Sequence, residues 1–242
     1  YMNGYNDPRR SAYFVAAKAD SKYHGVRCGT GNISAKTSQY AGDGISKLNV
    51  NKTTTPIVWM TAAESFFLRA EGALRGWAMG GSAQSFYEAG IKMSFLENNV
   101  SGAASYIADN TATPAAYTDN TGDGNDAAAP STITIAWDDA AGFEANLERI
   151  ITQKWIAMYP DGPEGWSEFR RTGYPKLFPV VKNESGGKVS SSVQIRRLPY
   201  PNSEYTTNSA AVAAGVAVLN AESNNATGDN GGTTLWWDKK SH

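Results

Sequence analysis

Apolar positions recur at steps of three and four along residues 57–98, and this spacing predicts two amphipathic helices. The first is expected over 60–77, with one face formed by Met60, Ala63, Phe67, Ala70, Leu74 and Trp77. Glycines at 80–81 end it, and Ser82 is a suitable N-cap for a second helix over 82–98. The apolar face of that helix holds Ala83, Phe86, Tyr87, Gly90, Ile91, Ser94 and Phe95. The short glycine turn predicts an antiparallel pair that packs closely through small residues, as in tetratricopeptide-like hairpins.

The two segments that flank this pair have weaker patterns. Residues 1–56 are rich in Gly, Ser, Thr and Asn and lack helical periodicity, which predicts loops and short turns. Residues 99–137 hold several acidic side chains but no Lys or Arg, which predicts a long surface loop or insertion.

Helical signals return in residues 138–242. Asp139 is expected to cap a helix that stops at Pro160, with an apolar stripe formed by Phe143, Leu147, Ile150, Ile151, Lys154, Trp155 and Met158. Pro163 then opens a short helix that ends at Gly173. An Ala-rich helix is expected from about 208 to 218. This part of the chain is therefore predicted to hold three helices and a closing segment.

Charge and residue counts exclude several classes of function. The 22 Lys and Arg against 23 Asp and Glu give a net charge of −1, so no basic field attracts a nucleic acid. No apolar run approaches the roughly 18 residues of a membrane-spanning helix. A single cysteine rules out an internal disulfide framework, and two histidines leave little for metal binding or acid–base catalysis.

Catalytic motifs are also missing from the sequence. No GxSxG nucleophile elbow is present, so a serine hydrolase is disfavoured. Glycosidases need two carboxylates, and Glu164 and Glu168 lie one helical turn apart. The same short helix carries Arg170 and Arg171, so ion pairing is favoured over acid catalysis, and both arginines are expected to be structural.

An oxygen-rich stretch at 119–126 raises the question of calcium. Asp119, Asp123 and Asp126 have the density of acceptors found in a calcium loop. The stretch lacks the terminal Glu of an EF-hand, and Thr121 stands where a further carboxylate is expected. A solvated loop is the favoured interpretation, and a calcium site is the alternative.

Aromatic side chains are the most informative class, with 7 Trp and 12 Tyr. The apolar faces of pyranose rings pack on aromatic rings, while polar side chains satisfy the sugar hydroxyls. Tryptophans in helical or terminal patterns are expected in the core; these are Trp155, Trp166, Trp236 and Trp237. Aromatic residues in loops are better candidates for contact with a sugar; these are Tyr23, Tyr40, Tyr117 and Trp137.

Several segments, taken in order, resemble one protein family. They are residues 6–10 (NDPRR), 56–71 (PIVWMTAAESFFLRAE), 153–157 (QKWIA), 164–175 (EGWSEFRRTGYP), 197–201 (RLPYP) and 235–238 (LWWD). Together they resemble the SusD/RagB family, the surface glycan-binding lipoproteins of Bacteroidetes. The resemblance covers nearly all 242 residues and corresponds to the C-terminal part of a longer protein.

The resemblance implies an all-α fold of tetratricopeptide-like helix pairs with long irregular loops. It also implies a non-enzymatic subunit without a cofactor, exposed on the cell surface and lipid-anchored at the outer membrane. That subunit would bind a glycan and deliver it to a SusC-like TonB-dependent transporter. No signal peptide or lipobox is recognisable here, so the anchor is expected outside this segment. Two alternatives stay open: a transporter lid for peptide or another nutrient, and a glycoside hydrolase.

Ligand contacts are expected from loops, because residues on the helix stripes are used for packing. The loop-rich first segment supplies Tyr23, His24, Arg27 and Tyr40, which offer ring faces and hydrogen-bond donors. Trp137, beside the acidic loop, is a further candidate.

Overall fold

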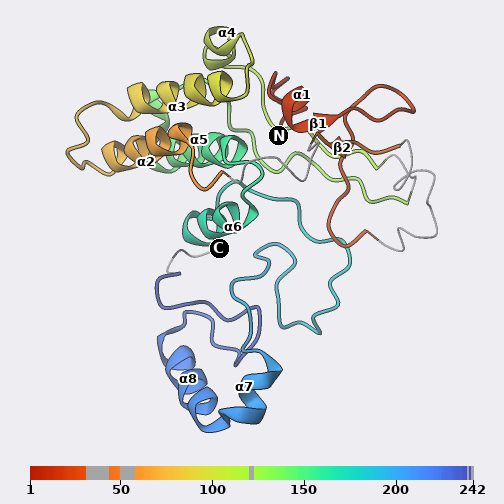
Figure 1. Cartoon of the computed structure of the whole chain (residues 1–242), viewed down its shortest axis with the longest axis vertical. Helices are drawn as coiled ribbons and strands as arrows, with labels where there is room; N and C mark the ends of the chain where they lie inside the picture. Colours follow the sequence, from red (N-terminus) through yellow and green to blue (C-terminus); the bar gives the residue numbers. More distant parts are fainter. Residues whose placement is uncertain (31–43, 50–57, 120–122, 239, 241–242) are drawn as a thin grey trace. The chain divides into compact units, whose positions relative to one another are not determined.

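Helices make up nearly all the regular structure of the computed structural model, which describes residues 1–30, 44–49, 58–119, 123–238 and 240 (Figure 1). They are α1 (Arg10–Tyr13), α2 (Ala62–Leu74), α3 (Ala83–Glu97), α4 (Ala103–Ile107), the 3-10 helix η3 (Asp139–Ala141), α5 (Gly142–Ala157), α6 (Gly162–Thr172), α7 (Asn202–Thr207) and α8 (Ser209–Glu222). Two short strands, β1 (Phe14–Val15) and β2 (Lys47–Leu48), pair in antiparallel fashion with Phe14 opposite Leu48. The all-α expectation is confirmed.

The chain divides into two compact units. Unit 1 comprises Tyr1–Val26, Asn32–Glu168 and Tyr174–Lys176, and unit 2 comprises Arg27–Gly31, Phe169–Gly173 and Leu177–His242. Unit 1 contains α1 to α5 and both strands, and unit 2 contains α7 and α8.

The expected helix pair is present as α2 and α3, which lie side by side with α5 in Figure 1. Ser82 caps α3 as predicted, and its hydroxyl accepts a hydrogen bond from the Ser85 amide at 3.1 Å. Helix α2 is shorter than expected, because the hydroxyl of Thr61 caps it at one end and Gly76, with φ of +81°, lies just beyond the other. Met60 and Trp77 therefore lie outside the helix and are exposed, which corrects their expected place on its apolar face.

The two helices approach closely at Gly90 of α3. A Cβ at this position would lie 2.9 Å from the ring of Phe67, which is fully buried in α2. Ala63 and Ala70 of α2 are also fully buried, so small side chains line this side of the helix. The glycine thus lets the ring of Phe67 pack directly on the backbone of α3.

Helix α5 is more deeply buried than its sequence pattern predicts. Nearly every residue from Asn146 to Ala157 is buried, including the polar ones, whereas the expected stripe residue Phe143 is exposed. The side chain of Lys154 is only 1% exposed, and its ammonium lies 3.1 Å from Glu168, 3.3 Å from Glu164 and 3.5 Å from Glu64. Burial of such a cation is tolerable only with partners of this kind.

The sequence-based expectation named Arg170 and Arg171 as the partners of Glu164 and Glu168, and it missed Lys154. The reason is that Lys154 lies on a different helix, so local spacing cannot show the contact. Arg170 itself donates a hydrogen bond to the carbonyl of Arg196 at 3.0 Å, in agreement with a structural role.

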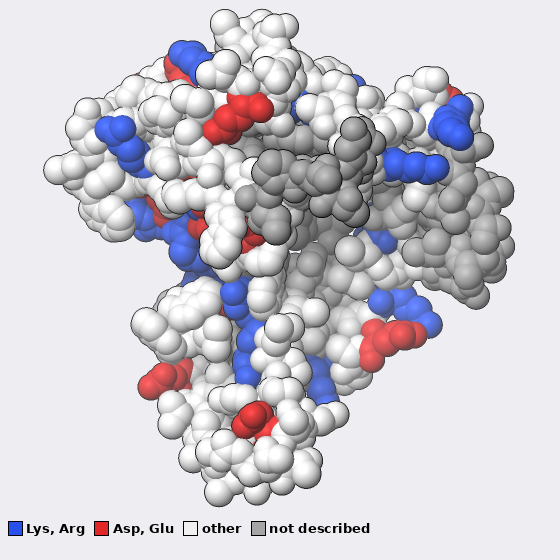
Figure 2. All heavy atoms as spheres, in the orientation of Figure 1, with Lys and Arg blue, Asp and Glu red and all other residues white. Residues whose placement is uncertain are grey.

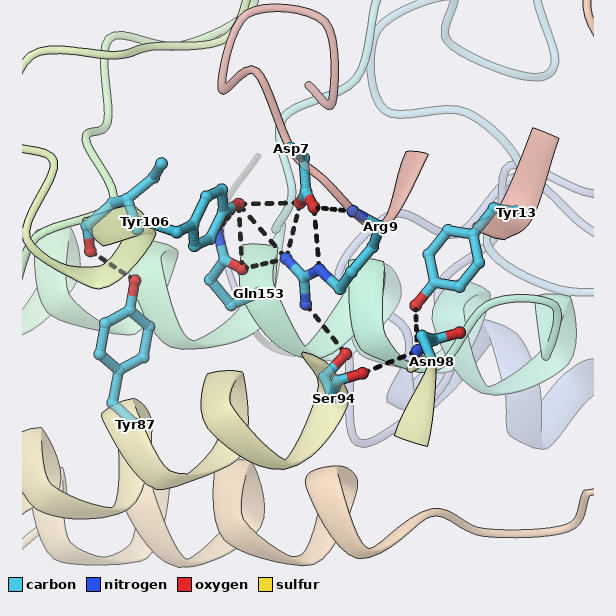
Figure 3. Close-up of polar contacts among 9 residues, drawn as sticks. Asp7, Arg9, Tyr13, Tyr87, Ser94, Asn98, Tyr106 and Gln153 are labelled. Atoms are coloured by element: carbon cyan, nitrogen blue, oxygen red, sulfur yellow. Dashed lines mark hydrogen bonds and ion pairs between the residues drawn. The ribbon is translucent and has the colours of Figure 1, made fainter. Parts of the chain in front are cut away.

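The N-terminal segment is held to the helices by a buried arginine (Figure 3). The side chains of Arg9 and Asp7 are both 0% exposed, and the guanidinium donates to both carboxylate oxygens, at 3.0 and 2.6 Å. It also donates to the Ser94 hydroxyl of α3 at 3.0 Å and to the Gln153 amide oxygen of α5 at 2.8 Å. Tyr106 of α4 donates to Asp7 at 2.9 Å. We call these five residues the Arg9 network.

The ionisation states of the Arg9 network follow from burial and charge. Burial disfavours the charged guanidinium, but the hydrogen bond and negative charge of Asp7 outweigh this, and the pKa of Arg9 lies above its ordinary value. Burial also raises the pKa of Tyr106 well above its usual value. The phenol of Tyr106 therefore keeps its proton and donates a hydrogen bond to the carboxylate of Asp7.

Unit 2 is built on a second pair of buried opposite charges. Arg196 donates to both carboxylate oxygens of Asp238, at 2.7 and 2.8 Å, and both side chains are 1% exposed. The adjacent Arg197 pairs with Asp229. The core position expected for Trp236 is wrong, because its side chain is 65% exposed at the surface.

We expect Gly90→Ala to lower the free energy of unfolding by about 1–3 kcal/mol, because the new methyl group overlaps the ring of Phe67. In an open helix the same change usually stabilises, by about 0.5–1 kcal/mol. Gly162→Ala in α6 is the matched control, since nothing lies within 4 Å of its Cβ position. Urea unfolding of the two variants checks this, and a Gly90→Ala variant that is as stable as the parent contradicts the close approach.

We expect Arg9→Met to cost about 3–5 kcal/mol of stability, because it leaves the buried carboxylate of Asp7 without its cation. The control is Lys92→Met on α3, where the ammonium is 57% exposed and lies 3.6 Å from Glu88. Loss of such a surface pair costs about 1 kcal/mol or less. Equal losses in the two variants, measured by urea unfolding, would argue against the importance of the Arg9 network.

Candidate ligand-binding site

A hollow of about 420 Å³ lies in unit 1, within the size range of small-molecule sites. Two loops and the segment that leads into α1 line it, and we call it the loop hollow. Its lining residues are Asn3, Arg10, Ser21, Lys22, Tyr23, His24, Gly25, Ala116, Tyr117 and Thr118. The structure thus brings together Tyr23, His24 and Tyr117, which the sequence had singled out separately.

Close packing at Gly4 positions the segment that leads into α1. A Cβ at Gly4 would overlap the carbonyl of Thr113 and the amide nitrogen of Ala115, so the absence of a side chain lets the two backbones touch. This contact sets Asn3 beside residues 116–118. Arg10 at the other end of this segment directly follows Arg9, which is anchored in the core.

Arg10 and Asn3 then hold Tyr23 in place. The guanidinium of Arg10 lies 4.5 Å from the centre of the Tyr23 ring and donates a hydrogen bond to the side-chain oxygen of Asn3 at 2.8 Å. The amide group of Asn3 donates in turn to the backbone carbonyl of Tyr23 at 2.8 Å. Because Arg10 covers one face of the ring, a ligand can stack only on the other face or meet the ring edge.

His24 is fixed by contacts on its backbone and its ring. Its amide donates to the Ser46 hydroxyl at 2.9 Å, and its ring Nε2 lies 2.8 Å from a carboxylate oxygen of Asp20. The hydrogen bond with His24, aided by the backbone amide of Lys22, holds the pKa of Asp20 below its usual value. Asp20 is therefore a carboxylate at neutral pH and sets the orientation of the imidazole.

Tyr117 also lines the hollow, and backbone hydrogen bonds hold it in place. It pairs with Ala127 in an antiparallel bridge, with amide-to-carbonyl distances of 2.8 and 3.0 Å in the two directions. Its side chain is half-buried, so part of the ring is accessible. Tyr117 thus offers aromatic surface beside a backbone bridge.

The remaining candidates from the sequence do not line the loop hollow. Arg27 belongs to unit 2, where it donates to the carbonyl of Pro179 at 2.7 Å. Trp137 packs against the core, with its ring centre 5.5 Å from that of Tyr87. Tyr40 lies outside the described residues.

The structure describes both ends of the calcium candidate loop, Asp119 and residues 123–126. Asp119 accepts hydrogen bonds from the backbone and side-chain amides of Asn125, at 3.2 and 2.9 Å, and Asp126 accepts one from the amide of Asp119. Across the part of the chain that the structure describes, no three acidic, imidazole or thiol groups converge as a metal site. The carboxylates of Asp119 and Asp126 thus accept hydrogen bonds within their own loop, and calcium binding by Asp119, Asp123 and Asp126 stays a prediction.

Sequence reasoning missed Asn3, Arg10 and Lys22 as lining residues. Asn3 and Arg10 reach the hollow because the backbone packs across more than a hundred residues of sequence, which no local pattern reveals. The sequence did contain a signal for Arg10, since this residue ends the NDPRR segment that carries part of the family resemblance. In that segment Arg9 is buried in the core and Arg10 lines the hollow.

A family model described as "Susd and RagB outer membrane lipoprotein" matches residues 1–238. The chain belongs to the SusD-like family. This family membership assigns the protein to the outer membrane as a lipoprotein. Within the described residues, no helix is both long enough and apolar enough to cross a bilayer. No curated protein matches the chain.

Solved structures of SusD homologues are similar to this chain over its whole length. One from Bacteroides thetaiotaomicron is 48% identical with a TM-score of 0.93, and the match covers 100% of this chain and 51% of that one. A chitin-binding SusD homologue from Flavobacterium johnsoniae is 49% identical with a TM-score of 0.90, covering 99% and 48%. One from Bacteroides ovatus is 44% identical with a TM-score of 0.90, covering 99% and 50%. This SusD-like chain thus spans about half the length of these homologues.

The position of Asn3 in the hollow of this SusD-like chain is expected to depend on Gly4. Gly4→Ala should cost about 1–3 kcal/mol of stability, because the methyl group can be accommodated only if one backbone moves. Gly25→Ala is the control, since Gly25 lines the same hollow but has nothing within 4 Å of its Cβ position. Its effect should stay within about 0.5 kcal/mol. Thermal unfolding compares the two, and a harmless Gly4→Ala would contradict the contact with residues 113–115.

Proposed function

We propose that this chain is the glycan-binding portion of a surface subunit that delivers oligosaccharide to a SusC-like TonB-dependent transporter. The observation that carries the proposal is the loop hollow, where Tyr23 and Tyr117 stand among hydrogen-bond donors. Membership of the SusD-like family and similarity to a chitin-binding homologue support the same class of ligand.

The chemistry of the hollow suits a sugar. The accessible parts of Tyr23 and Tyr117 offer apolar surface for the faces of a pyranose ring, while Asn3, Ser21 and Thr118 can exchange hydrogen bonds with hydroxyl groups. A site with one or two rings gives weak binding, with Kd in the micromolar to millimolar range. Weak binding suits a subunit that must release its cargo.

The subunit binds without catalysis in this proposal. The common mechanisms of glycoside hydrolysis use two carboxyl groups on either side of the scissile bond. The described residues that line the loop hollow include no Asp or Glu. A saccharide held there meets donors and rings but no acid–base pair.

Calorimetric titration of the protein with a panel of oligosaccharides tests the proposal. Tyr117→Ala should weaken binding by about 0.5–1.5 kcal/mol, or about 2- to 12-fold, because an aromatic contact is lost. Tyr23→Ala should weaken it by a similar amount. Trp236→Ala removes an exposed aromatic side chain from unit 2 and serves as the control that leaves affinity unchanged.

Two further readouts make this test decisive. Circular dichroism shows whether each variant keeps its helices, and chromatography of the recovered saccharide shows whether it is unaltered. Cleaved saccharide would favour the hydrolase alternative. Binding of peptides but of no saccharide would favour the transporter lid for another nutrient. Saccharide binding that survives both tyrosine changes in folded protein would remove the loop hollow as the site.

A further inference from the structure

The ionisable side chains of the loop hollow are strongly biased in charge. Arg10, Lys22 and His24 line it together with two tyrosines, and no carboxylate is among its described lining residues. Basic side chains are visible on the loop that follows β1 (Figure 2). The hollow is therefore a local basic surface on a chain whose net charge is only −1.

Arg10 and Lys22 have no carboxylate partner among the described residues, and in unit 1 the same holds for Arg69 and Arg149 but not for several other cations. Arg9 and Lys154 are each neutralised by carboxylates, and so is the exposed Lys92. The guanidinium of Arg10, by contrast, contacts an amide oxygen and an aromatic ring. Within the described residues, the ammonium of Lys22 forms no ion pair.

One acidic side chain, that of Asp20, lies close to the hollow, and its negative charge belongs in the charge balance of the hollow. Asp20 accepts hydrogen bonds from the backbone amide of Lys22 and from the ring of His24. Asp20 is not a lining residue, but its negative charge also acts on Lys22. The two cations Arg10 and Lys22 against the one carboxylate of Asp20 leave one net positive charge at the hollow.

We infer that the loop hollow selects acidic saccharides, those that carry carboxylate or sulfate groups, over neutral ones. This inference rests on the proposed function. A planar guanidinium matches the geometry of a carboxylate or sulfate, and Lys22 supplies a second positive charge. Tyr23 and Tyr117 contact the sugar ring to which the acidic group is attached. Charge and ring surface thus act on the same ligand.

Matched pairs of ligands provide the test. Each pair shares one backbone and differs only in charge: oligogalacturonate and its methyl ester, a hyaluronan oligosaccharide and its carboxyl-reduced form, and a chondroitin sulfate oligosaccharide and its desulfated, carboxyl-reduced form. In at least one pair the acidic member should bind more tightly. Its advantage should shrink as ionic strength rises from about 0.01 to about 0.15 M, because the screening length falls from about 30 to about 8 Å.

Variants then assign the preference to the hollow. Lys22→Gln should weaken binding of the acidic member about fivefold and reduce its advantage over the neutral member, because one exposed charge contact is lost. Lys22→Arg should keep most of the advantage. Arg10→Lys retains the positive charge but loses the planar guanidinium. The preference for the acidic member over the neutral one should therefore decrease without being lost. Lys92→Gln, on α3, is the matched control and should change neither affinity.

The outcomes separate this inference from the proposed function. If no saccharide of any kind binds, both are overturned. If neutral members and chito-oligosaccharides bind as well as acidic ones, glycan binding stands and the charge preference is overturned. A preference that Lys22→Gln leaves intact in folded protein also overturns it. So does inorganic sulfate that displaces the acidic saccharide at equal concentration, since the site would then recognise a small anion rather than a sugar.

Discussion

The charge of Arg9 has to be neutralised inside the core, and unit 1 is arranged around that requirement. An unpaired buried guanidinium would cost several kcal/mol, so its partners must reach it from wherever they lie in the sequence. Asp7 comes from the same loop, Ser94 from α3 and Gln153 from α5. The N-terminal segment is consequently fixed against two helices. The next residue, Arg10, is thereby placed at the loop hollow, which makes the core pairing a condition for the geometry of the site.

The helix pair could be predicted from the sequence because apolar spacing and capping are local properties. Phe67 and Gly90 were assigned to the faces that the structure buries. The stripe placed Lys154 on the buried side of α5, but the full depth of the helix could not be predicted, because Asn146 and Gln153 carry polar groups that a periodicity argument cannot place in a core. The partners of Gln153 and Lys154 lie on other segments, so only the folded chain shows that they are satisfied.

The site could be predicted in part for a similar reason. Aromatic residues in polar loops are recognisable in a sequence, which is why Tyr23 and Tyr117 were found. Arg10 was not, since its role depends on a backbone contact between distant segments. The segments that carry the family resemblance supply the buried ion pairs of Arg9, Lys154 and Asp238. Such motifs identify the scaffold, and they say less about the ligand.

Two of the segments around the hollow, residues 21–25 and 116–118, lie outside the Arg9 network. Lys22 and Thr118 are exposed, and neither takes part in the Arg9 network. Substitutions at such positions leave the buried charges paired. Evolution can therefore alter the residues that line the hollow, while selection on folding keeps the ion-paired core the same.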